Sequence, residues 1–423
     1  MTRVKNYKQI ALNQNREIVL DLIETGLEAI NTKEVISKNI RLSDNILTIQ
    51  SQAFDLSLFE NIKIVGFGKA SCQAASALEE ILGNKIKEGA VIGLKQITCN
   101  YIDTYSGSHP KPSQANVLPG QKIFEIADKS TEKDLLIVIV SGGGSALLCY
   151  PEDECMQGEK LYEHFLKSGE SIIEMNTIRK HLSLLKGGGL LKVAYPATVI
   201  GLIFSDVPGD SFGEVASGPT YKDMTTVDDA QNLINKYNLG EFKLIETPKE
   251  DKYFQKVHNF VLVSNKTAIS KIEEKVKQFG LKSKVISTDL YDNVNLSLEK
   301  IFSSLEDDCV VLAAGEPKLK VVGNSGSGGR NLYMALKSTE FNDFENGEVF
   351  VSLASDGMDN SPSAGALVDN LTLQKIKDLN INIKEHLDKF DAYTVFEKTE
   401  DLIMTGPTDA NVSDIMILLK KYE

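Results

Sequence analysis

The chain has 423 residues, of which 42% are hydrophobic and 25% charged, and its formal net charge is −13. This length exceeds what one hydrophobic core supports and predicts two domains, while the ordinary globular composition excludes a fibre or a disordered chain. An acidic surface repels nucleic acid unless basic residues gather on one face, and the sequence contains no Lys/Arg block. A small anionic substrate stays compatible with this charge, because local cations and helix N-termini can reverse the potential within one site.

The cysteines and the N-terminal residues bear on the compartment. The five cysteines are odd in number and form no CxxC pair, which argues against a disulfide framework or a Cys-rich zinc site and favours a reducing cytoplasm. The first ten residues lack the apolar core of a signal peptide, and no apolar run approaches the roughly 20 residues that span a bilayer. We therefore expect a cytoplasmic protein without a membrane or nucleic-acid partner; a homo-oligomer stays open.

Taken along the chain, apolar periodicity predicts one helix and then alternating strands and helices. Residues 17–30 repeat apolar positions on one helical face. Short apolar runs, each followed by a glycine or polar turn, lie at 62–67, 135–140, 198–204 and 260–263, with later runs that end at Ala313 and Ala354. Continuous apolar strands between helices predict α/β domains with largely parallel sheets. The charged, aperiodic stretch at 240–256 predicts the boundary, which gives domains at residues 1–240 and 241–423.

Two glycine-rich loops follow strands of the first predicted sheet. Ligands of parallel α/β sheets bind beyond the carboxyl ends of the strands. In the first loop Gly66 and Gly68 allow close backbone approach, and Lys69 stands at a helix start that favours anions; a plain turn with a solvated lysine is the alternative. In the second loop consecutive N–H groups and two hydroxyls can form an anion nest, or simply a flexible turn. That second loop comprises Ser141, Gly142, Gly143, Gly144 and Ser145.

The segment 176–189 combines basic residues with a glycine stop. If the segment is helical throughout, Arg179, Ser183 and Lys186 share one face, which would present two cations. The three glycines that follow are a usual helix C-terminal signal. A solvated basic stripe is the alternative, and His181, which lies off this face, is interpreted as structural.

Acidic residues follow two further apolar runs. Asp206 and Asp210 come after the run 198–204, and Asp356 and Asp359 come after the run that ends at Ala354. Carboxylates at strand ends suit Mg²⁺, which takes one or two of them together with phosphate oxygens and water. Aspartate also favours turns for local reasons, so each pair alone is weak evidence.

A third glycine-rich loop, residues 323–331, leads into a helical pattern. Arg330 stands at the helix start behind this loop, where a guanidinium can hold phosphate oxygens with two parallel hydrogen bonds. A last loop at residues 405–412 is also expected to open a helix. Together, cations, backbone nests and carboxylates are what phosphoryl transfer needs, because its catalysis is mostly positioning and charge neutralisation. No GxxxxGK[ST] sequence occurs, so a nucleotide site here is not of the Walker type.

These motifs resemble those of the class II glycerate kinases, whose C-terminal part is called the MOFRL domain. The resemblance covers nearly the whole chain in order, through GFGKA (66–70), SGGGSALL (141–148), the segment 176–188, SDVPGD (205–210), ASGPT (216–220), GGRN (328–331), SDGMD (355–359) and GPT with NV (406–412). It implies an ATP- and Mg²⁺-dependent kinase that makes 2-phosphoglycerate from D-glycerate. It also implies a Rossmann-like N-terminal domain and a MOFRL-type C-terminal domain, facing each other across a cleft.

The resemblance also implies roles for individual residues. The expected catalytic residues are Lys69, Arg330, Asp206 and Asp356, and the two aspartates are also the expected Mg²⁺ ligands. The expected ATP-binding residues are Gly66, Gly68, Ser141, Gly142, Gly143, Gly144, Ser145, Gly326, Gly328, Gly329 and Asn331. The expected substrate ligands are Arg179, Lys186, Asp409 and Asn411. Ala314, Ser355 and the pair Asp409-Ala410 depart from the family pattern, and the last departure adds a carboxylate that would alter acid binding.

Two other functions compete with the kinase. GFGKAS suggests an NAD(P)H-dependent hydroxypyruvate reductase, but Ser71 occupies the third glycine position of the dinucleotide motif. The next apolar run, 90–94, ends in Lys95 where a ribose-binding acid is expected. The departures near Asp409 suggest, as a second alternative, a non-catalytic nucleotide-binding relative of the kinases.

Overall fold

The computed structural model describes residues 2–168, 172–207, 209, 211–321 and 326–422. The chain divides into two compact units, which we call the central unit, residues 32–262, and the terminal unit, residues 1–31 with 263–423. The division therefore falls later than the boundary at 240/241 that we predicted from charge. The first 31 residues also belong with the C-terminal half, which no sequence signal indicated. Each unit is described by itself, so the predicted cleft between the domains stays a prediction.

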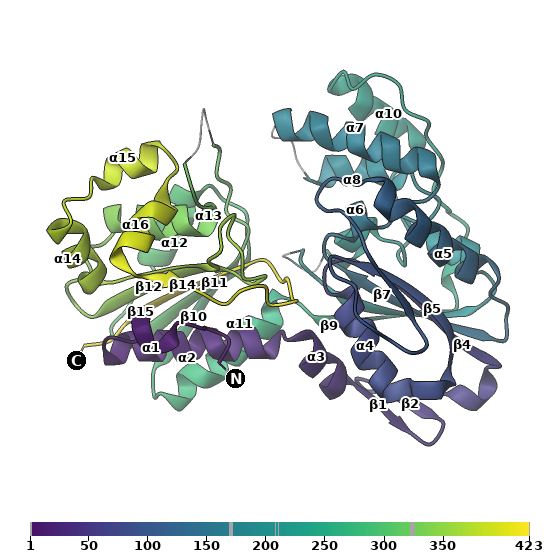
Figure 1. The fold of residues 1–423 in the computed structure, drawn as a ribbon, viewed down its shortest axis with the longest axis horizontal. Helices are drawn as coiled ribbons and strands as arrows, with labels where there is room; N and C mark the ends of the chain where they lie inside the picture. Colours follow the sequence, from purple (N-terminus) through teal and green to yellow (C-terminus); the bar gives the residue numbers. More distant parts are fainter. Residues whose placement is uncertain (1, 169–171, 208, 210, 322–325, 423) are drawn as a thin grey trace. The chain divides into compact units, whose positions relative to one another are not determined.

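The central unit is built on a six-stranded sheet in the order β6-β5-β4-β7-β8-β9 (Figure 1). Numbered by appearance within this sheet, the order is 3-2-1-4-5-6, as in doubly wound α/β sheets, whose ligand site lies where the order reverses. Here the reversal lies between β4 and β7, and all pairs from β6 to β8 are parallel. The strands are β4 (Asn61–Phe67), β5 (Ile86–Gly93), β6 (Asp103–Ser106), β7 (Asp134–Ser141), β8 (Thr198–Phe204) and β9 (Val257–Val263).

Helices cover both faces of this sheet, which explains why β7 is buried along its whole length. Val65 and Phe67 of β4 contribute to a core cluster shared with α5 and α9, while α4 contacts β4, β5 and β7 from the other face (Figure 1). A small hairpin sheet precedes it, with β1 (Ile40–Ser43), β2 (Ile46–Ile49) and β3 (Gln52–Asp55). The helices are α3 (Thr32–Asn39), α4 (Ser71–Leu82), α5 (Val117–Asp128), α6 (Gly144–Leu147), α7 (Glu152–Ser168), α8 (Ile172–Lys180), α9 (Gly189–Ala194) and α10 (Val227–Lys236).

The terminal unit has a second six-stranded sheet, in the order β10-β11-β15-β12-β13-β14. Only β10 and β11 form a parallel pair; the other neighbours are antiparallel. The expectation of largely parallel pairing therefore fails in this unit, because the last strand, β15, inserts between β11 and β12, and strand direction is not encoded in an apolar run. The strands are β10 (Lys282–Leu290), β11 (Cys309–Gly315), β12 (Glu348–Ala354), β13 (Gly365–Val368), β14 (Leu402–Ile403) and β15 (Asp414–Lys420).

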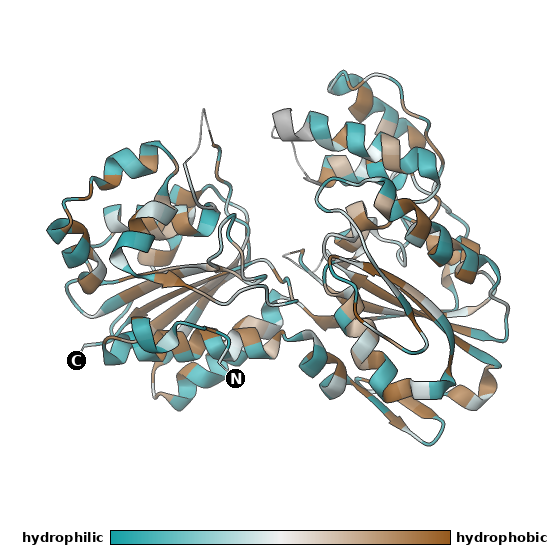
Figure 2. Ribbon diagram, in the orientation of Figure 1, coloured by the Kyte–Doolittle hydropathy of each residue, from teal (hydrophilic) through white to brown (hydrophobic). Residues whose placement is uncertain are grey.

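Helices also cover both faces of the terminal sheet, and the strands between them are mostly hydrophobic, as the ribbon colours in Figure 2 show. On one face α2 packs against α11 so closely that a methyl group at Gly26 would lie 2.8 Å from Ile272 Cδ1. Helix α2 confirms the helix expected at 17–30. The helices are α1 (Tyr7–Ile10), α2 (Gln14–Ala29), α11 (Asn265–Gln278), α12 (Val294–Phe302), α13 (Arg330–Lys337), α14 (Asn370–Asp378), α15 (Ile383–Asp388) and α16 (Ala392–Thr399).

A buried arginine fastens α2 to the C-terminal half. The fully buried Arg16 pairs with Asp369 at 2.5 Å and with Asp401 at 2.8 Å, and both aspartates are buried as well. Removing one member of such a group leaves an uncompensated charge in the interior, which is costly. None of the helices in the described part of the chain combines the length and apolar character that crossing a bilayer requires.

Candidate active site

Three loops meet beyond the carboxyl ends of β4, β7 and β8, where the order of the central sheet reverses. The backbone N–H of Lys69 donates to Gly142 O at 2.8 Å, and the N–H of Ala70 donates to Ser141 Oγ at 3.1 Å. These bonds hold the β4 loop on the β7 loop. The structure thus brings together the two glycine-rich loops that the sequence singled out.

Asp206, after β8, reaches the same place. A methyl group at Gly142 would lie 2.1 Å from Asp206 Oδ2, so only glycine leaves room for this carboxylate. Burial raises the pKa of Asp206, and the charge of Lys69 and the N–H of Gly143 partly offset that rise. We call Lys69, Gly142, Gly143 and Asp206 the lysine cluster. It sets one cation and one carboxylate beside a glycine turn that is partly accessible at Gly143, which suits an anionic ligand.

Close backbone approach accounts for another predicted glycine. Gly68 has φ +122°, and a methyl group there would lie 2.2 Å from Ser141 Oγ. Gly66 and Gly144 are packed as tightly, against Ile139 and Ala216. The glycines therefore serve the docking of the β4 and β7 loops, and their contact with ATP stays a prediction.

The segment 176–189 is not one helix. Helix α8 ends at Lys180, and the N–H groups of Gly187 and Gly188, both with positive φ, donate to Ser217 O and Gly218 O across the unit. The predicted common helical face for Arg179, Ser183 and Lys186 is therefore wrong. Contacts with the segment 211–218 override the helical pattern at this point.

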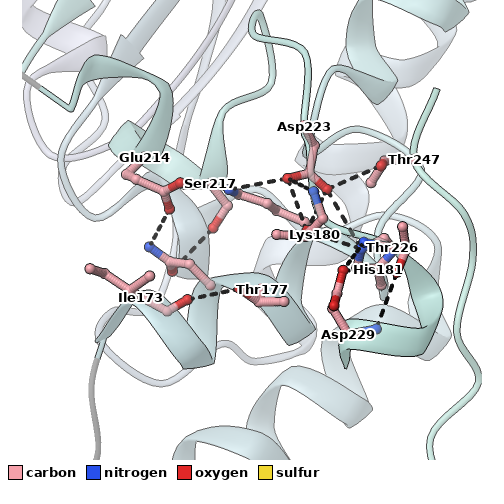
Figure 3. Close-up of polar contacts among 12 residues, drawn as sticks. Ile173, Thr177, Lys180, His181, Glu214, Ser217, Asp223, Thr226, Asp229 and Thr247 are labelled. Atoms are coloured by element: carbon pink, nitrogen blue, oxygen red, sulfur yellow. Dashed lines mark hydrogen bonds and ion pairs between the residues drawn. The ribbon is translucent and has the colours of Figure 1, made fainter. Parts of the chain in front are cut away.

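Arg179 and Ser145 belong to one hydrogen-bond network, part of which Figure 3 shows. Asn176 Oδ1 accepts from Arg179 Nη1 at 3.4 Å and from Ser217 Oγ at 3.3 Å, and Ser217 Oγ lies 2.8 Å from Ser145 Oγ. Glu214 accepts from Asn176 Nδ2 at 3.5 Å and from Lys180 Nζ at 2.7 Å. Burial lowers the pKa of Arg179 to about 10, which leaves the guanidinium charged at neutral pH.

His181 is structural, as its position off the predicted face suggested. The ring is fully buried, with Nδ1 3.0 Å from Ile245 O and Nε2 3.2 Å from Thr225 Oγ1. Figure 3 shows His181 beside Asp223. The neighbouring Asp223 accepts from Thr225 and Thr247. These bonds connect the end of α8 to the segments that precede and follow α10.

Lys186 lies in the interior with an acidic partner. Its Nζ donates to Leu148 O at 2.6 Å and pairs with Glu154, and both charged side chains are buried. A small pocket lined by Ser145, Cys149, Glu154, Arg179 and Lys186 joins the lysine to the network above. Glu154 already neutralises the charge of Lys186. Lys186 could therefore serve the stability of the fold instead of the substrate binding that the sequence predicted.

We expect replacement of Lys186 by methionine to lower the free energy of unfolding by about 3–5 kcal/mol, because Glu154 would keep a buried charge without its partner. Urea denaturation followed by circular dichroism measures this change. The double variant Lys186→Met/Glu154→Gln removes both charges and should recover at least half of the loss. Lys33→Ala, in an exposed pair with Glu80, should cost less than about 1 kcal/mol. A stable Lys186→Met protein with a raised KM for substrate would instead support the ligand role.

Arg330 lies at the first residue of α13 in the terminal unit. Its Nε donates to Asp414 Oδ2 at 2.6 Å, and Nη1 lies 3.8 Å from Glu316 Oε2. Asp414 is buried, and burial raises its pKa while Arg330 lowers it. The side chain of Arg330 is 30% exposed, so Asp414 fixes one edge of the guanidinium and leaves the other toward solvent.

Asp359 caps the same helix. Its carboxylate accepts from the backbone N–H groups of Asn331 at 3.1 Å and Leu332 at 2.7 Å, and a methyl group at Gly329 would lie 2.4 Å from Asp359 Oδ1. Asn331 is fixed further by Ser352 Oγ, which donates to its Oδ1 at 2.6 Å. The predicted ATP-binding residues Gly329 and Asn331 therefore pack on an aspartate.

Burial raises the pKa of Asp359 to about 6, against the opposing N–H donors of α13. Because the folded-state pKa lies above that of the unfolded chain, the contribution of Asp359 to stability is fully present below about pH 4 and is lost as the pH rises through 6. We expect the amide resonances of Asn331 and Leu332 to titrate with a midpoint near pH 6. Asp359→Asn should abolish this titration, and a midpoint near pH 4 would contradict the assignment.

The remaining predicted residues of the terminal unit lie on neighbouring loops. The N–H of Met358 donates to Asp356 Oδ1 at 3.2 Å, and the negative charge of Asp356 raises the pKa of Asp414, which places Asp356 near Arg330. The N–H of Thr408 donates to Asp356 O at 3.1 Å, so the loop with Asp409 adjoins it. Asp409 is exposed with φ +56°, and Asn411 Oδ1 accepts from the N–H of Ser413. The loop leads into strand β15 and not into the expected helix.

The start of the third glycine-rich loop is only partly described. The N–H of Gly326 donates to Lys389 O, and a methyl group there would lie 2.4 Å from Asp391 Cβ. Gly328 has φ +121° and lies beside Tyr393. Asp210 and residues 323–325, which the sequence also singled out, lie outside the described residues.

The candidate residues thus form two groups, one in each unit. The lysine cluster and the Arg179 network belong to the central unit, and Arg330 with its aspartates belongs to the terminal unit. Within the described ranges, no three His, Cys, Asp or Glu side chains are grouped as metal ligands. Asp206 and Asp356 each offer a single carboxylate, which fits Mg²⁺ only as an ion held largely by phosphate oxygens.

Two residues of these groups escaped the sequence reasoning. Asp414 starts the last apolar run, 414–420, and attention to the start of that run as well as to strand ends could have found it. His109 follows β6, which has only four residues and gives too short an apolar signal to mark a strand. Its ring lies against Gly143.

Comparison with known proteins agrees with this architecture. Residues 18–246 match a domain of unknown function (DUF4147), and residues 309–414 match the MOFRL family. A doubly wound unit joined to a second α/β unit is also the fold of a solved glycerate kinase from Thermotoga maritima, with a TM-score of 0.83, 28% identity, and coverage of 96% of this chain and 99% of that one.

Two curated relatives are similar over most of their length. A glycerate 2-kinase from Pyrococcus horikoshii is 31% identical over 96% of this chain and 97% of its own. A putative hydroxypyruvate reductase from Agrobacterium vitis is 31% identical over 84% of this chain and 86% of its own. The fold and the two groups of site residues define a two-unit α/β enzyme. The chain belongs to the glycerate 2-kinase (MOFRL) family, which confirms the resemblance read from its motifs.

Proposed function

We infer that the protein is a kinase that transfers the γ-phosphoryl group of ATP to D-glycerate and forms 2-phosphoglycerate. The observation that carries this inference is the similarity to glycerate 2-kinases over nearly the full chain, joined to a cation near a carboxylate in each unit, Lys69 near Asp206 and Arg330 beside Asp414. The oxygen of the acceptor hydroxyl bonds to the γ-phosphorus, the bond to the β-phosphate oxygen breaks, and ADP leaves.

The lysine cluster supplies what this step needs on the protein side. Lys69 offsets charge on the transferred phosphoryl group, where a fixed cation is most effective because it costs no reorganisation. Asp206, whose pKa is raised by burial, accepts the hydroxyl proton. Arg179 and Ser145, joined through Asn176 and Ser217, can hold further anionic oxygens of a substrate.

Arg330 of the terminal unit is the second cation that we propose for binding phosphate oxygens. Asp414 occupies Nε of Arg330, so the two Nη groups are those that can bind phosphate oxygens as a fork. If Mg²⁺ accompanies ATP, Asp206 in the central unit and Asp356 in the terminal unit are each a candidate carboxylate for it, and the ion would neutralise phosphate charge. We propose ATP as the donor and Mg²⁺ as its counterion on this basis.

The direct test supplies purified protein with ATP, Mg²⁺ and D-glycerate and follows ADP release. Coupling to enolase, which acts on 2-phosphoglycerate and not on 3-phosphoglycerate, identifies the phosphorylated hydroxyl. L-glycerate and omission of Mg²⁺ are the matched controls. Absence of ADP release above background with D-glycerate and related hydroxy acids would refute the proposal.

A hydroxypyruvate reductase is the second candidate function, because the Agrobacterium vitis relative carries that name. Ser71 occupies the position of the third glycine of a dinucleotide motif. Its Oγ lies 3.2 Å from Ser141 Oγ, so the residue joins the β4 and β7 loops. We expect no oxidation of NADH or NADPH with hydroxypyruvate. A decrease in absorbance at 340 nm would favour the reductase, and a protein that binds ATP without any turnover would favour a non-catalytic relative.

The cysteines bear on the proposed compartment. All five are free. Free, mostly buried thiols fit a reducing environment. The cytoplasm therefore stays our prediction for where the protein acts.

A further inference from the structure

His109 lies against the turn that carries the lysine cluster. A methyl group built at Gly143 would lie 2.9 Å from His109 Cδ2, 3.0 Å from His109 Nε2 and 3.2 Å from Lys69 Cγ. The imidazole and the lysine stem therefore flank one backbone position, and Asp206 packs on the preceding glycine. Side chains that follow β4, β6 and β8 thus converge on the two glycines that follow β7.

The loop that carries His109 is held firmly. Asn116, which is fully buried, accepts from the N–H of Ser108 at 2.8 Å and donates to Ser108 O at 3.0 Å and to Ala146 O at 2.9 Å. Ala146 lies in α6, the helix that follows Gly143. A methyl group at Gly107 would lie 2.6 Å from Ile92 Cδ1, so the loop also packs on the sheet. Asn116 therefore fixes the histidine relative to the lysine cluster.

The partial burial and the hydrogen-bonding chemistry of His109 favour contact with a ligand over a purely structural role. His109 is only partly buried, and the ring edge formed by Cδ2 and Nε2 borders the glycine turn. An imidazole N–H is a strong donor to an anionic oxygen, and Lys69 and the glycine turn already favour negative charge there. His181, whose role is structural, differs in burial, because its ring is fully buried.

We propose that His109 is a further active-site residue, whose Nε2 contacts an anionic oxygen of the reactants beside Lys69 and Asp206. The oxygen belongs to the carboxylate of the acceptor acid or to the phosphoryl group in transfer. This inference rests on the proposed kinase function for its kinetic test, and on ligand binding alone for its second test.

Kinetics of three variants test the contact. His109→Ala should lower kcat/KM at least tenfold with an unchanged melting temperature. His109→Gln, whose amide nitrogen can replace Nε2, should retain more activity than His109→Asn, whose amide lies nearer the position of Nδ1. A raised KM for glycerate assigns the carboxylate, and a raised KM for ATP or a lowered kcat assigns the phosphoryl group. His164→Ala, exposed on α7, is the control. Activity of His109→Ala within twofold of wild type overturns the proposal.

Binding to the wild-type protein gives a test that does not need turnover. The chain has five histidines, so their ring Cε1–H resonances can be resolved, and the one missing in His109→Gln is assigned to His109. The non-hydrolysable analogue Mg-AMP-PNP, which keeps a γ-phosphoryl group, or D-glycerate should shift this resonance and leave that of His164 in place. If neither ligand shifts it, the inference fails; if it shifts in a protein that shows no turnover, the inference stands and the kinase proposal fails.

Discussion

Replacing Lys69 by alanine should lower kcat by about a hundredfold to a thousandfold, with a smaller change in the KM for glycerate. Lys69 stands on the loop after β4, where Gly142 O fixes its backbone and Asp206 lies close enough to feel its charge. A preorganised cation aimed at charge that develops in the transition state is worth about this much. A coupled assay of ADP release at saturating ATP and glycerate measures the loss.

A matched control separates this effect from a general loss of positive charge. Lys33→Ala removes a lysine from an exposed ion pair in the same unit and should leave kcat within about twofold of wild type. Because the Lys69 side chain is only partly buried, the variant should melt within a few degrees of wild type. More than a tenth of wild-type kcat in Lys69→Ala would contradict the role of this residue.

Arg330→Ala should impair both activity and stability. Asp414 would remain buried without its partner, which is expected to cost about 3–5 kcal/mol of unfolding free energy. The loss of the guanidinium fork should lower kcat/KM by more than a hundredfold. Urea denaturation and steady-state kinetics on the same preparations measure the two effects.

The lysine variant at this position distinguishes the two functions of the side chain. Arg330→Lys keeps a charge near Asp414 and should recover part of the stability, but it cannot bind two oxygens as a planar fork and should recover little activity. Arg41→Ala, at an exposed position on β1, should change neither quantity. If Arg330→Lys regains full activity, a point charge suffices and the fork is dispensable.

Asp359 should also affect how the stability of the protein depends on pH, because its pKa is raised to about 6. Several exposed carboxylates, such as Glu385 beside Lys389, have lowered pKa values and contribute in the opposite direction. The comparison of wild type with Asp359→Asn isolates the buried group.

The apolar runs predicted the strands well, because a strand buried on both faces must be apolar throughout. The strands β4, β7, β8, β11 and β12 all lie at or near the positions expected from those runs. The order in which the strands pair could not be predicted as well. The insertion of β15 between β11 and β12 is a long-range choice that the local pattern of residues 414–420 does not record.

The sequence also predicted which loops carry the candidate site residues. It did not predict which side chains these residues contact. Gly142 and Asp206 were both singled out, yet their direct packing depends on β7 and β8 being neighbours. The helical pattern at 176–189 failed because Gly187 and Gly188 find backbone partners in the segment after Ser211. Nothing in the sequence around Lys186 indicates its buried partner Glu154, which lies on α7.

The membership of residues 1–31 in the terminal unit sets an order of events on the ribosome. Helix α2 is synthesised before every strand of the sheet it will cover, and β15 is synthesised after all of them. Residues 32–262 form one uninterrupted stretch and can fold as they emerge. The leading helix must wait with its apolar face and Arg16 exposed until Asp369 and Asp401 leave the exit tunnel, which makes this segment a natural client for a nascent-chain chaperone.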